Sequence, residues 1–370
     1  MLLTMNHPTA RLAALGQSLW LDNISREILS NGTLARYIAQ WSVTGLTSNP
    51  TIFEQAIGHG SAYDDAIAHA ARCGVPPEAL FFSLALQDLT AAAAMFRPVF
   101  DATGGTDGWV SLEVSPLLAD DAVKTIQAAA WLHEAAALPN LFIKIPGTAA
   151  GLRAIEESIF NGVPVNVTLL FSREHYLAAA EAYLRGIERR IAGGLSAKVA
   201  SVASIFVSRW DVAVKQEIAP ALHNRLGLAI AMRTYKAYRE LLASARWQKL
   251  AAAGAQPQRL LWASTGTKDP AAPDTLYVQA LAAPDTINTI PEKTLKAFAE
   301  HGQAGAVLPL DGGYAEAVLQ EFAREGVDDE ALAARLQQEG AAAFTASWNA
   351  LLQRITHKSE SALGTPNGSG

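Results

Sequence analysis

Residues Leu141–Thr148 read LFIKIPGT, an almost wholly apolar run that is interrupted by one lysine, Lys144. A continuous apolar run of this length is typical of a strand buried on both faces, as in a parallel sheet. Burying an unpaired ammonium in such a strand is costly. Lys144 is therefore either a structural lysine paired with a carboxylate or a reactive amine, because apolar surroundings favour the neutral form that attacks carbonyl carbons.

Seven further short apolar runs alternate with alanine-rich amphipathic segments along the chain. The predicted strands are Ser18–Ile24, Val43–Ser48, Trp109–Ser115, Leu141–Pro146, Pro164–Phe171, Lys198–Val207, Arg259–Thr265 and Thr286–Pro291. The predicted helical segments between them include Ala119–Leu138, Ser172–Ala192, Asp211–Ala253 and Pro273–Ala283. The α/β order implies a parallel sheet, and eight such units favour a closed (β/α)8 barrel, the TIM barrel, over a doubly wound open sheet.

The surplus length predicts helical additions to one barrel domain of residues 1–357. Residues 51–108 form an insertion after the second strand, with helix starts expected at Ser61 and at Pro76-Pro77. Residues 314–357 predict further helices near the C-terminal end. Residues 358–370, rich in Ser, Gly, Thr and Pro, predict a flexible tail or a linker.

Composition narrows the class of partner. The 370 residues include 29 basic and 35 acidic side chains without a basic block, which argues against nucleic acid or a membrane as the main partner. Cys73 is the single cysteine and the eight histidines are scattered, so we expect no metal, nucleotide or other cofactor. The start of the sequence lacks the pattern of a signal peptide, and we expect a cytoplasmic protein that acts on small molecules.

Polar residues recur near the carboxyl ends of the predicted strands, where a parallel barrel places its active site. The two-residue period sends Glu113 of the third strand and Asp22 of the first strand into the barrel. Other strands add Thr47, Asn49, Asn166, Thr168, Ser204 and Phe206. A helix cap or a turn explains any one of these positions, but capping does not explain why five strands each bring a polar group beside Lys144.

A lysine with two carboxylates suits carbonyl chemistry through a covalent imine, which acts as an electron sink. Asp22 is the candidate base that takes a proton from the β-hydroxyl so that a carbon-carbon bond breaks. Glu113, through a water held with Thr168, is the candidate proton shuttle for imine formation. We expect Asn49, Asn166 and Ser204 to hold the hydroxyl groups of the donor substrate.

Five segments resemble transaldolase of the longer bacterial type, within the class I Schiff-base aldolases. They are LWLDNISR at 19–26, GLTSNPTIF at 45–53, FIKIPGT at 142–148, NVTLLFS at 166–172 and WASTGTK at 262–268. The resemblance covers most of residues 15–305. It implies transfer of a dihydroxyacetone unit from sedoheptulose 7-phosphate to glyceraldehyde 3-phosphate, giving erythrose 4-phosphate and fructose 6-phosphate, in the pentose phosphate pathway.

The resemblance carries the same catalytic roles onto Lys144, Asp22, Glu113 and Thr168 and adds two positions near the acceptor phosphate. These two are Arg209 and Ser264. Many transaldolases have an arginine just after the serine of the seventh strand, whereas this chain reads Thr265-Gly266-Thr267-Lys268. Lys268 offers a point charge where arginine offers a bidentate fork, so the preferred sugar phosphates stay open.

Two rival functions stay open at this point. One is a class I aldolase that releases its three-carbon product to water; Phe206 argues against it, because phenylalanine cannot orient water on the imine as a tyrosine would. The other is a sugar phosphate binding barrel without turnover, in which Lys144 serves only as a charge. The sequence also leaves open a homo-oligomer and a fusion or association with another enzyme of sugar phosphate metabolism.

Overall fold

The computed structural model describes residues 7–364, and all eight predicted strands are present in it. They are β1 (Ser18–Asp22), β2 (Val43–Thr47), β3 (Val110–Glu113), β4 (Leu141–Pro146), β5 (Val165–Leu170), β6 (Ser201–Phe206), β7 (Arg259–Ala263) and β8 (Thr286–Pro291). The bounds of β4 and β8 agree with the prediction, and the other strands are shorter by one to three residues at an end.

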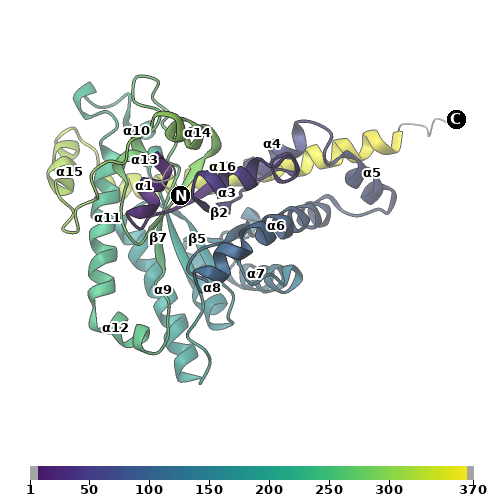
Figure 1. Ribbon diagram of the computed structural model, residues 1–370, viewed down its shortest axis with the longest axis horizontal. Coiled ribbons are helices and arrows are strands. Elements are labelled where there is room, and N and C mark those ends of the chain that lie inside the picture. The colour runs from purple at the N-terminus through teal and green to yellow at the C-terminus, as the bar shows by residue number, and fades with distance from the viewer. Residues whose placement is uncertain (1–6, 365–370) are drawn as a thin grey trace.

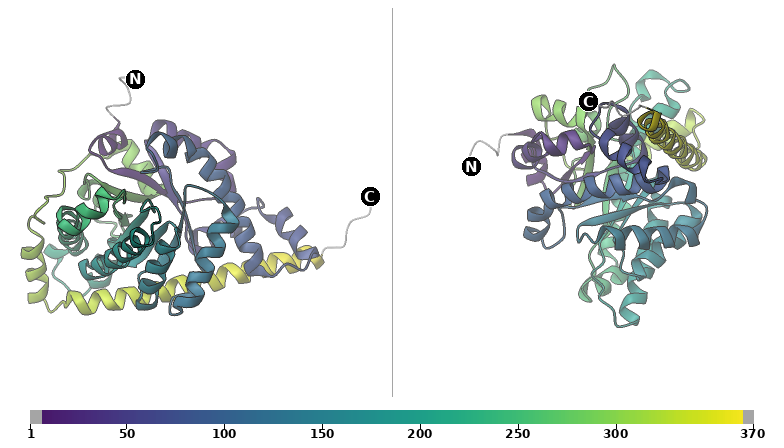
Figure 2. Two further views of the ribbon diagram at one scale, coloured as in Figure 1. Left: turned by 90° about the horizontal axis from the view of Figure 1, so that it is seen from below. Right: turned by 90° about the vertical axis from the view of Figure 1, so that its right-hand side faces the viewer.

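The strands are parallel and lie in the order β2-β1-β8-β7-β6-β5-β4-β3, with helices around the outside (Figures 1 and 2). Strands β2 and β3 at the two ends of this order approach each other, where Leu46 N donates to Trp109 O at 3.0 Å and Gly108 N donates to Thr44 O at 2.9 Å. This approach makes the sheet a nearly closed barrel, as predicted, and excludes the open doubly wound alternative.

One helix precedes β1, and the others around the barrel follow the strands, although not always with the expected lengths. They are α1 (Pro8–Ala14), α2 (Arg26–Ser30), α3 (Thr33–Gln40), α7 (Ala122–Ala136), α8 (Ala149–Phe160), α9 (Arg173–Ala192), α10 (Ser208–Val214), α11 (Leu226–Ala243), α12 (Ala245–Ala252), α13 (Leu276–Ala280) and α14 (Glu292–His301), with 3-10 turns η1 (Pro116–Leu118) and η2 (Pro220–Leu222). The predicted helical segment Asp211–Ala253 is divided among α10, η2, α11 and α12. Pro220 starts η2, and Ser244 ends α11 and caps α12.

The predicted helical additions are present as α4 (Pro50–Gly58), α5 (Asp64–Arg72) and α6 (Pro77–Ala102) after β2, and as α15 (Ala315–Arg324) and α16 (Asp329–Gly364) at the far end. Helix α16 crosses the molecule and runs beside α4 and α5 (Figures 1 and 2). Over residues 358–364 the structure has the end of α16 where a tail was predicted, and the rest of the predicted tail, residues 365–370, lies outside the described residues. Lys358 holds this end of α16 in place, since its Nζ donates to Gly60 O at 3.0 Å and to Asp64 Oδ1 at 2.5 Å.

Helix α6 is long and apolar enough to cross a membrane by length and composition. However, 56% of its most apolar window is buried inside the protein, and the helix packs against β2, β3 and α16. Its apolar character therefore has a ready explanation as a core helix.

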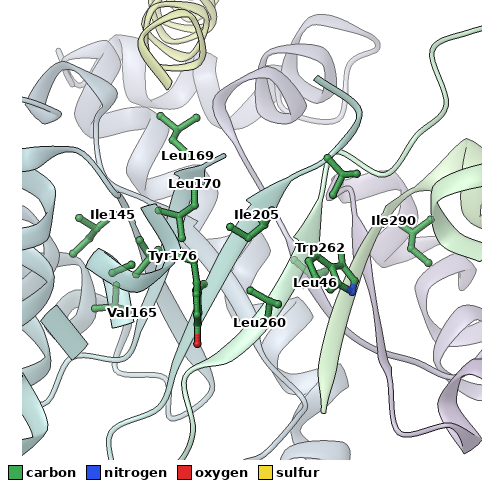
Figure 3. Packing of buried hydrophobic residues seen from close by; sticks show 14 of the residues in the cluster. Leu46, Ile145, Val165, Leu169, Leu170, Tyr176, Ile205, Leu260, Trp262 and Ile290 are labelled. Carbon is green, nitrogen blue, oxygen red and sulfur yellow. The ribbon is translucent and has the colours of Figure 1, made fainter. Parts of the chain in front are cut away.

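Two apolar layers fix the position of the polar groups. Outward side chains of the strands, among them Ile145, Ile205 and Trp262, join one large cluster with the surrounding helices (Figure 3). Inside the barrel a second cluster consists of Trp20, Trp109, Phe142, Val202, Leu261, Ala263 and Ile287. The rings of Trp109 and Phe142 stack at 4.1 Å between centroids. This cluster fills the barrel interior below the carboxyl ends and forms the floor of the cavity described below.

The buried carboxyl of Asp211 joins three helices behind β6 and β7. It accepts hydrogen bonds from Leu226 N at 2.9 Å, from Gly227 N at 3.2 Å and from the Tyr277 hydroxyl at 2.7 Å. Burial raises the pKa of Asp211 from 3.8 to about 6, although these donors oppose the rise.

Asp211→Asn should change how stability depends on pH. Between about pH 4 and pH 6 the folded protein holds a proton on Asp211 that the unfolded chain has released, so wild-type stability falls as the pH rises through this window. Asparagine does not titrate. The free energy of unfolding of the wild type minus that of the variant should therefore decrease by about 2 kcal/mol from pH 4 to pH 7, in urea titrations. A difference that stays constant over this range would contradict this.

Candidate active site

A cavity of about 380 Å³ opens at the carboxyl ends of the strands. It is lined by eleven of the twelve predicted site residues: Asp22, Thr47, Asn49, Lys144, Asn166, Thr168, Ser204, Phe206, Arg209, Ser264 and Lys268. The twelfth, Glu113, lies behind Lys144 and contacts its ammonium. The structure thus brings together residues from six strands and the loops that follow them.

Lys144 is held between two oxygen atoms in the barrel interior. Its Nζ donates to Glu113 Oε2 at 3.2 Å and to Ser48 O at 3.0 Å, and the Lys144 and Glu113 side chains are each 7% exposed. The pairing follows from the strand register, which aligns Glu113 of β3 with Lys144 of β4 and Lys144 with Asn166 of β5. Both interpretations of Lys144 are therefore compatible with its surroundings, since it has a carboxylate partner and also faces a cavity.

The two carboxyl groups share one electrostatic environment. Desolvation raises the pKa of Glu113, and the nearby Lys144 charge and hydrogen bond oppose it. Desolvation also raises the pKa of Asp22, opposed by a hydrogen bond from Thr47 and by the charges of Lys144 and Lys268. The Thr47 hydroxyl lies 2.7 Å from Asp22 and 2.6 Å from the Thr289 hydroxyl. Both carboxyls are thus easier to protonate than ordinary ones, which suits groups that exchange protons.

Strands β5 and β6 supply a row of oriented polar groups. Ser204 Oγ donates to Asn166 Oδ1 at 2.7 Å, and Asn166 Nδ2 donates to Ser111 Oγ at 3.2 Å. The Thr168 hydroxyl is buried and has no hydrogen-bond partner within residues 7–364. A buried hydroxyl without a partner is costly, so Thr168 is available to a substrate or a water molecule. Asn49 has a second task, because its Oδ1 accepts from Ile52 N and caps α4.

Two cations lie at the open side of the cavity. Arg209 in the first turn of α10 and Lys268 after β7 are exposed, and neither forms an ion pair in the described part of the chain. Ser264 lines the same cavity with a φ of +55°, and its hydroxyl is 2.9 Å from that of Ser208. Two unpaired cations and a hydroxyl at one rim fit an anionic group such as a phosphate.

Sequence reasoning missed two residues of this cavity that bear on its chemistry. Phe344 of α16 lies over Lys144, with the ammonium 5.9 Å from the ring centroid, and it packs against Phe206 at 6.5 Å. No local pattern connects α16 with β4, so Phe344 had no signal in the sequence. Thr289 did have one, because it is a polar residue near the carboxyl end of β8, the same signal that identified Thr47.

Comparison with known proteins agrees with the geometry. Residues 19–355 match the family described as Transaldolase/Fructose-6-phosphate aldolase. The chain belongs to this family. It is 44% identical over 367 residues to a transaldolase of Parafrankia sp., covering 97% of this chain and 100% of that relative.

Two other relatives align over similar lengths. Transaldolase 1 of Streptomyces avermitilis is 46% identical over 358 residues, covering 93% of this chain and 94% of that protein. A transaldolase of Neisseria gonorrhoeae is 44% identical over 340 residues, covering 92% and 97%. Family membership thus extends over the barrel and over most of α16, which carries Phe344.

Lys144→Met should raise the pKa of Glu113 further above its ordinary value. The variant keeps the length of the side chain but removes the positive charge that opposes desolvation of the carboxyl. Carbon-13 NMR of glutamate-labelled protein should show a larger protonated fraction of Glu113 at neutral pH, with Glu113→Gln used to assign its signal. Lys198→Met, on the opposite end of the barrel, is the control. A Glu113 titration that stays unchanged or moves down in Lys144→Met would rule out this coupling.

Proposed function

We propose that this protein is a transaldolase that moves a dihydroxyacetone unit between sugar phosphates through an imine on Lys144. The observation that carries the proposal is the Lys144–Glu113 hydrogen bond at 3.2 Å in the wall of a cavity that also holds Asp22. Membership of the family supports the reaction class. The proposed reaction converts sedoheptulose 7-phosphate and glyceraldehyde 3-phosphate into erythrose 4-phosphate and fructose 6-phosphate, a step of the pentose phosphate pathway.

In the proposed reaction Lys144 must lose a proton before it attacks the ketose carbonyl. Glu113 is within reach of that proton and has a raised pKa, so it can accept it. The carbinolamine then loses water, with protons passing through a water molecule that Glu113 and Thr168 hold. The resulting iminium draws electrons from the neighbouring carbon-carbon bond. Asp22 takes the proton of the β-hydroxyl, the bond breaks, an aldose phosphate leaves, and the enamine remains on Lys144.

The remaining groups of the cavity are assigned to binding. Asn49, Asn166 and Ser204 hold the hydroxyls of the three-carbon unit. Arg209, Lys268 and Ser264 receive the phosphate of the aldose at the open rim. When the acceptor aldose binds, the enamine adds to its aldehyde carbon, and Asp22 returns the proton to the new hydroxyl. Hydrolysis then frees the product ketose from Lys144.

A free aldolase that releases its three-carbon product is the second candidate. Phe206 argues against it, because its ring lies between those of Phe171 at 5.3 Å and Phe344 at 6.5 Å and offers no hydroxyl to a water molecule. An apolar wall at this place disfavours protonation and hydrolysis of the enamine by water. The enamine should therefore persist until an acceptor aldehyde arrives, which favours transfer.

Borohydride trapping tests the proposal. Incubation with fructose 6-phosphate and borohydride should reduce the imine and attach a sugar fragment to Lys144, which peptide mass spectrometry locates. Lys144→Met should give no adduct. Asp22→Asn should still be trapped, but as the intact ketose adduct with little aldehyde released, because the amide cannot accept the hydroxyl proton. A label on Lys198 or Lys268, or normal turnover by Lys144→Met, would refute the proposal.

Arg209→Ala should raise the Michaelis constant for glyceraldehyde 3-phosphate more than that for unphosphorylated glyceraldehyde. Removing a charge-assisted hydrogen bond to the phosphate costs about 1.5 to 3 kcal/mol, which corresponds to roughly a 10- to 100-fold weaker acceptor. Lys268→Ala should raise the same Michaelis constant, but by a smaller factor. Both effects should shrink at high salt, because both cations are exposed and salt screens their charges. Lys198→Ala, at the other end of the barrel, is the control. Equal effects on both acceptors would remove these residues from phosphate recognition.

A further inference from the structure

Gln337 of α16 joins the ends of the two strands that carry Lys144 and Thr168. Its Nε2 donates to Gly147 O at 3.1 Å and to Leu169 O at 2.9 Å. Gly147 directly follows β4, three residues after Lys144, and Leu169 directly follows Thr168 in β5. One side-chain amide therefore satisfies two backbone carbonyls at the rim of the cavity.

The backbone after Thr168 is irregular and needs this partner. The register between β5 and β6 shifts between Val167 and Leu170, and Leu169 has a φ of +59°. A bulky residue in the left-handed region is strained and persists only where its surroundings hold it. The irregularity also removes the Leu169 carbonyl from the regular ladder, and Gln337 is the hydrogen-bond donor that the structure gives it.

Helix α16 also packs directly against the side chain of Leu169. The side chain of Leu169 is 2% exposed and lies at the top of β5 beneath α16 (Figure 3). At Gly340, one turn after Gln337, a Cβ atom would approach Leu169 Cδ2 to 2.9 Å, so a larger residue here would require the Leu169 side chain or the helix to shift. Gln337 and Gly340 thus fix the irregular turn by a hydrogen bond and by direct packing.

The same turn decides where the Thr168 hydroxyl points. Its Oγ1 has no hydrogen-bond partner in the described residues, so no hydrogen bond of its own orients it. Its orientation depends on the backbone, which Gly147 N holds through a 2.8 Å bond to Thr168 O. Gln337 holds both residues next to this bond, because its Nε2 donates to the carbonyl oxygens of Gly147 and of Leu169.

The helix that carries Gln337 is itself anchored elsewhere. Ser347 accepts a hydrogen bond from Thr51 at 2.8 Å, and Arg354 forms an ion pair with Glu54 at 2.7 Å, both on α4. These anchors lie about three to five turns further along α16. Gln337 is therefore supported by a frame that does not include β4 or β5.

We propose that Gln337 is a positioning residue for imine formation, which holds the turn after Thr168 so that the Thr168 hydroxyl faces Lys144. Gln337 contacts no reacting atom and acts through Thr168. The inference rests on the proposed Schiff-base function. It predicts a defect in the steps that make and dehydrate the carbinolamine, and no defect in recognition of the acceptor phosphate, which is assigned to Arg209 and Lys268 and not to the two carbonyls that Gln337 contacts.

Gln337→Met keeps the length of the side chain and removes both hydrogen bonds. We expect the rate of borohydride trapping with fructose 6-phosphate and kcat to fall together by about 10- to 100-fold, the cost of a small misplacement near reacting groups. The Michaelis constant for glyceraldehyde 3-phosphate should change by less than about twofold. Gln337→Lys, which restores donors to the two carbonyls, should recover most of the rate. Gln338→Met, on the exposed neighbouring position, should behave as wild type.

A double-mutant cycle separates positioning from general support of the fold. If Gln337 acts through Thr168, Gln337→Met should cost little once Thr168→Ala is present. The inference is overturned if Gln337→Met lowers the trapping rate by the same factor with and without Thr168→Ala, or if Gln337→Met alone traps at the wild-type rate. Gln337→Glu, which has the same shape without the donor, replaces the methionine variant if thermal unfolding shows that the latter does not fold. Failure of the proposed function is distinguishable, because then the wild type itself gives no adduct on Lys144.

Discussion

The buried ion pair between Lys144 and Glu113 is the constraint on which the site depends. An ammonium and a carboxylate, each 7% exposed, are stable inside a barrel only if each satisfies the other and the remaining donors find oxygen atoms. The register of β3 and β4 puts the two side chains side by side, and Ser48 O supplies the second acceptor. A shift of one residue in either strand would turn one charge into the outer apolar layer. The chemistry of this site thus requires an accurately registered barrel.

The alternation of inward and outward residues explains why most of the site was predictable from the sequence. Trp20, Phe142 and Val202 each lie two residues before a cavity residue on the same strand, so the apolar floor and the polar site follow from one pattern. The pattern fails where the backbone is irregular. The run NVTLLFS gives no sign that Leu169 adopts a left-handed conformation, because its side chain is as apolar as a regular buried strand requires.

Contributions from α16 were not predictable for a different reason. Phe344 and Gln337 reach the site by tertiary docking, and no local periodicity records which surface a distant helix covers. Residues 358–364 were expected in a tail for a similar reason, since their composition is that of a linker while Lys358 contacts the turn between α4 and α5. The barrel strands carry the groups to which the proposed reaction assigns chemistry, and α16 covers Lys144 with Phe344 as a roof. In the proposed reaction this roof matters because an enamine on Lys144 is destroyed if water reaches and protonates it.

In the proposed reaction, the charge of Lys268 at the rim bears on the chemistry as well as on binding. The charge of Lys268 lowers the pKa of Asp22, against the rise that desolvation causes. In the proposed reaction Asp22 carries a proton after the donor is cleaved and must keep it until the acceptor aldehyde has bound. A phosphate dianion seated on Lys268 offsets that positive charge, which raises the pKa of Asp22 and favours its protonated form. The acceptor phosphate would then keep Asp22 protonated until the enamine adds to the aldehyde, and Asp22 would give its proton to the alkoxide that forms. Recognition of the phosphate would in this way be linked to formation of the carbon-carbon bond.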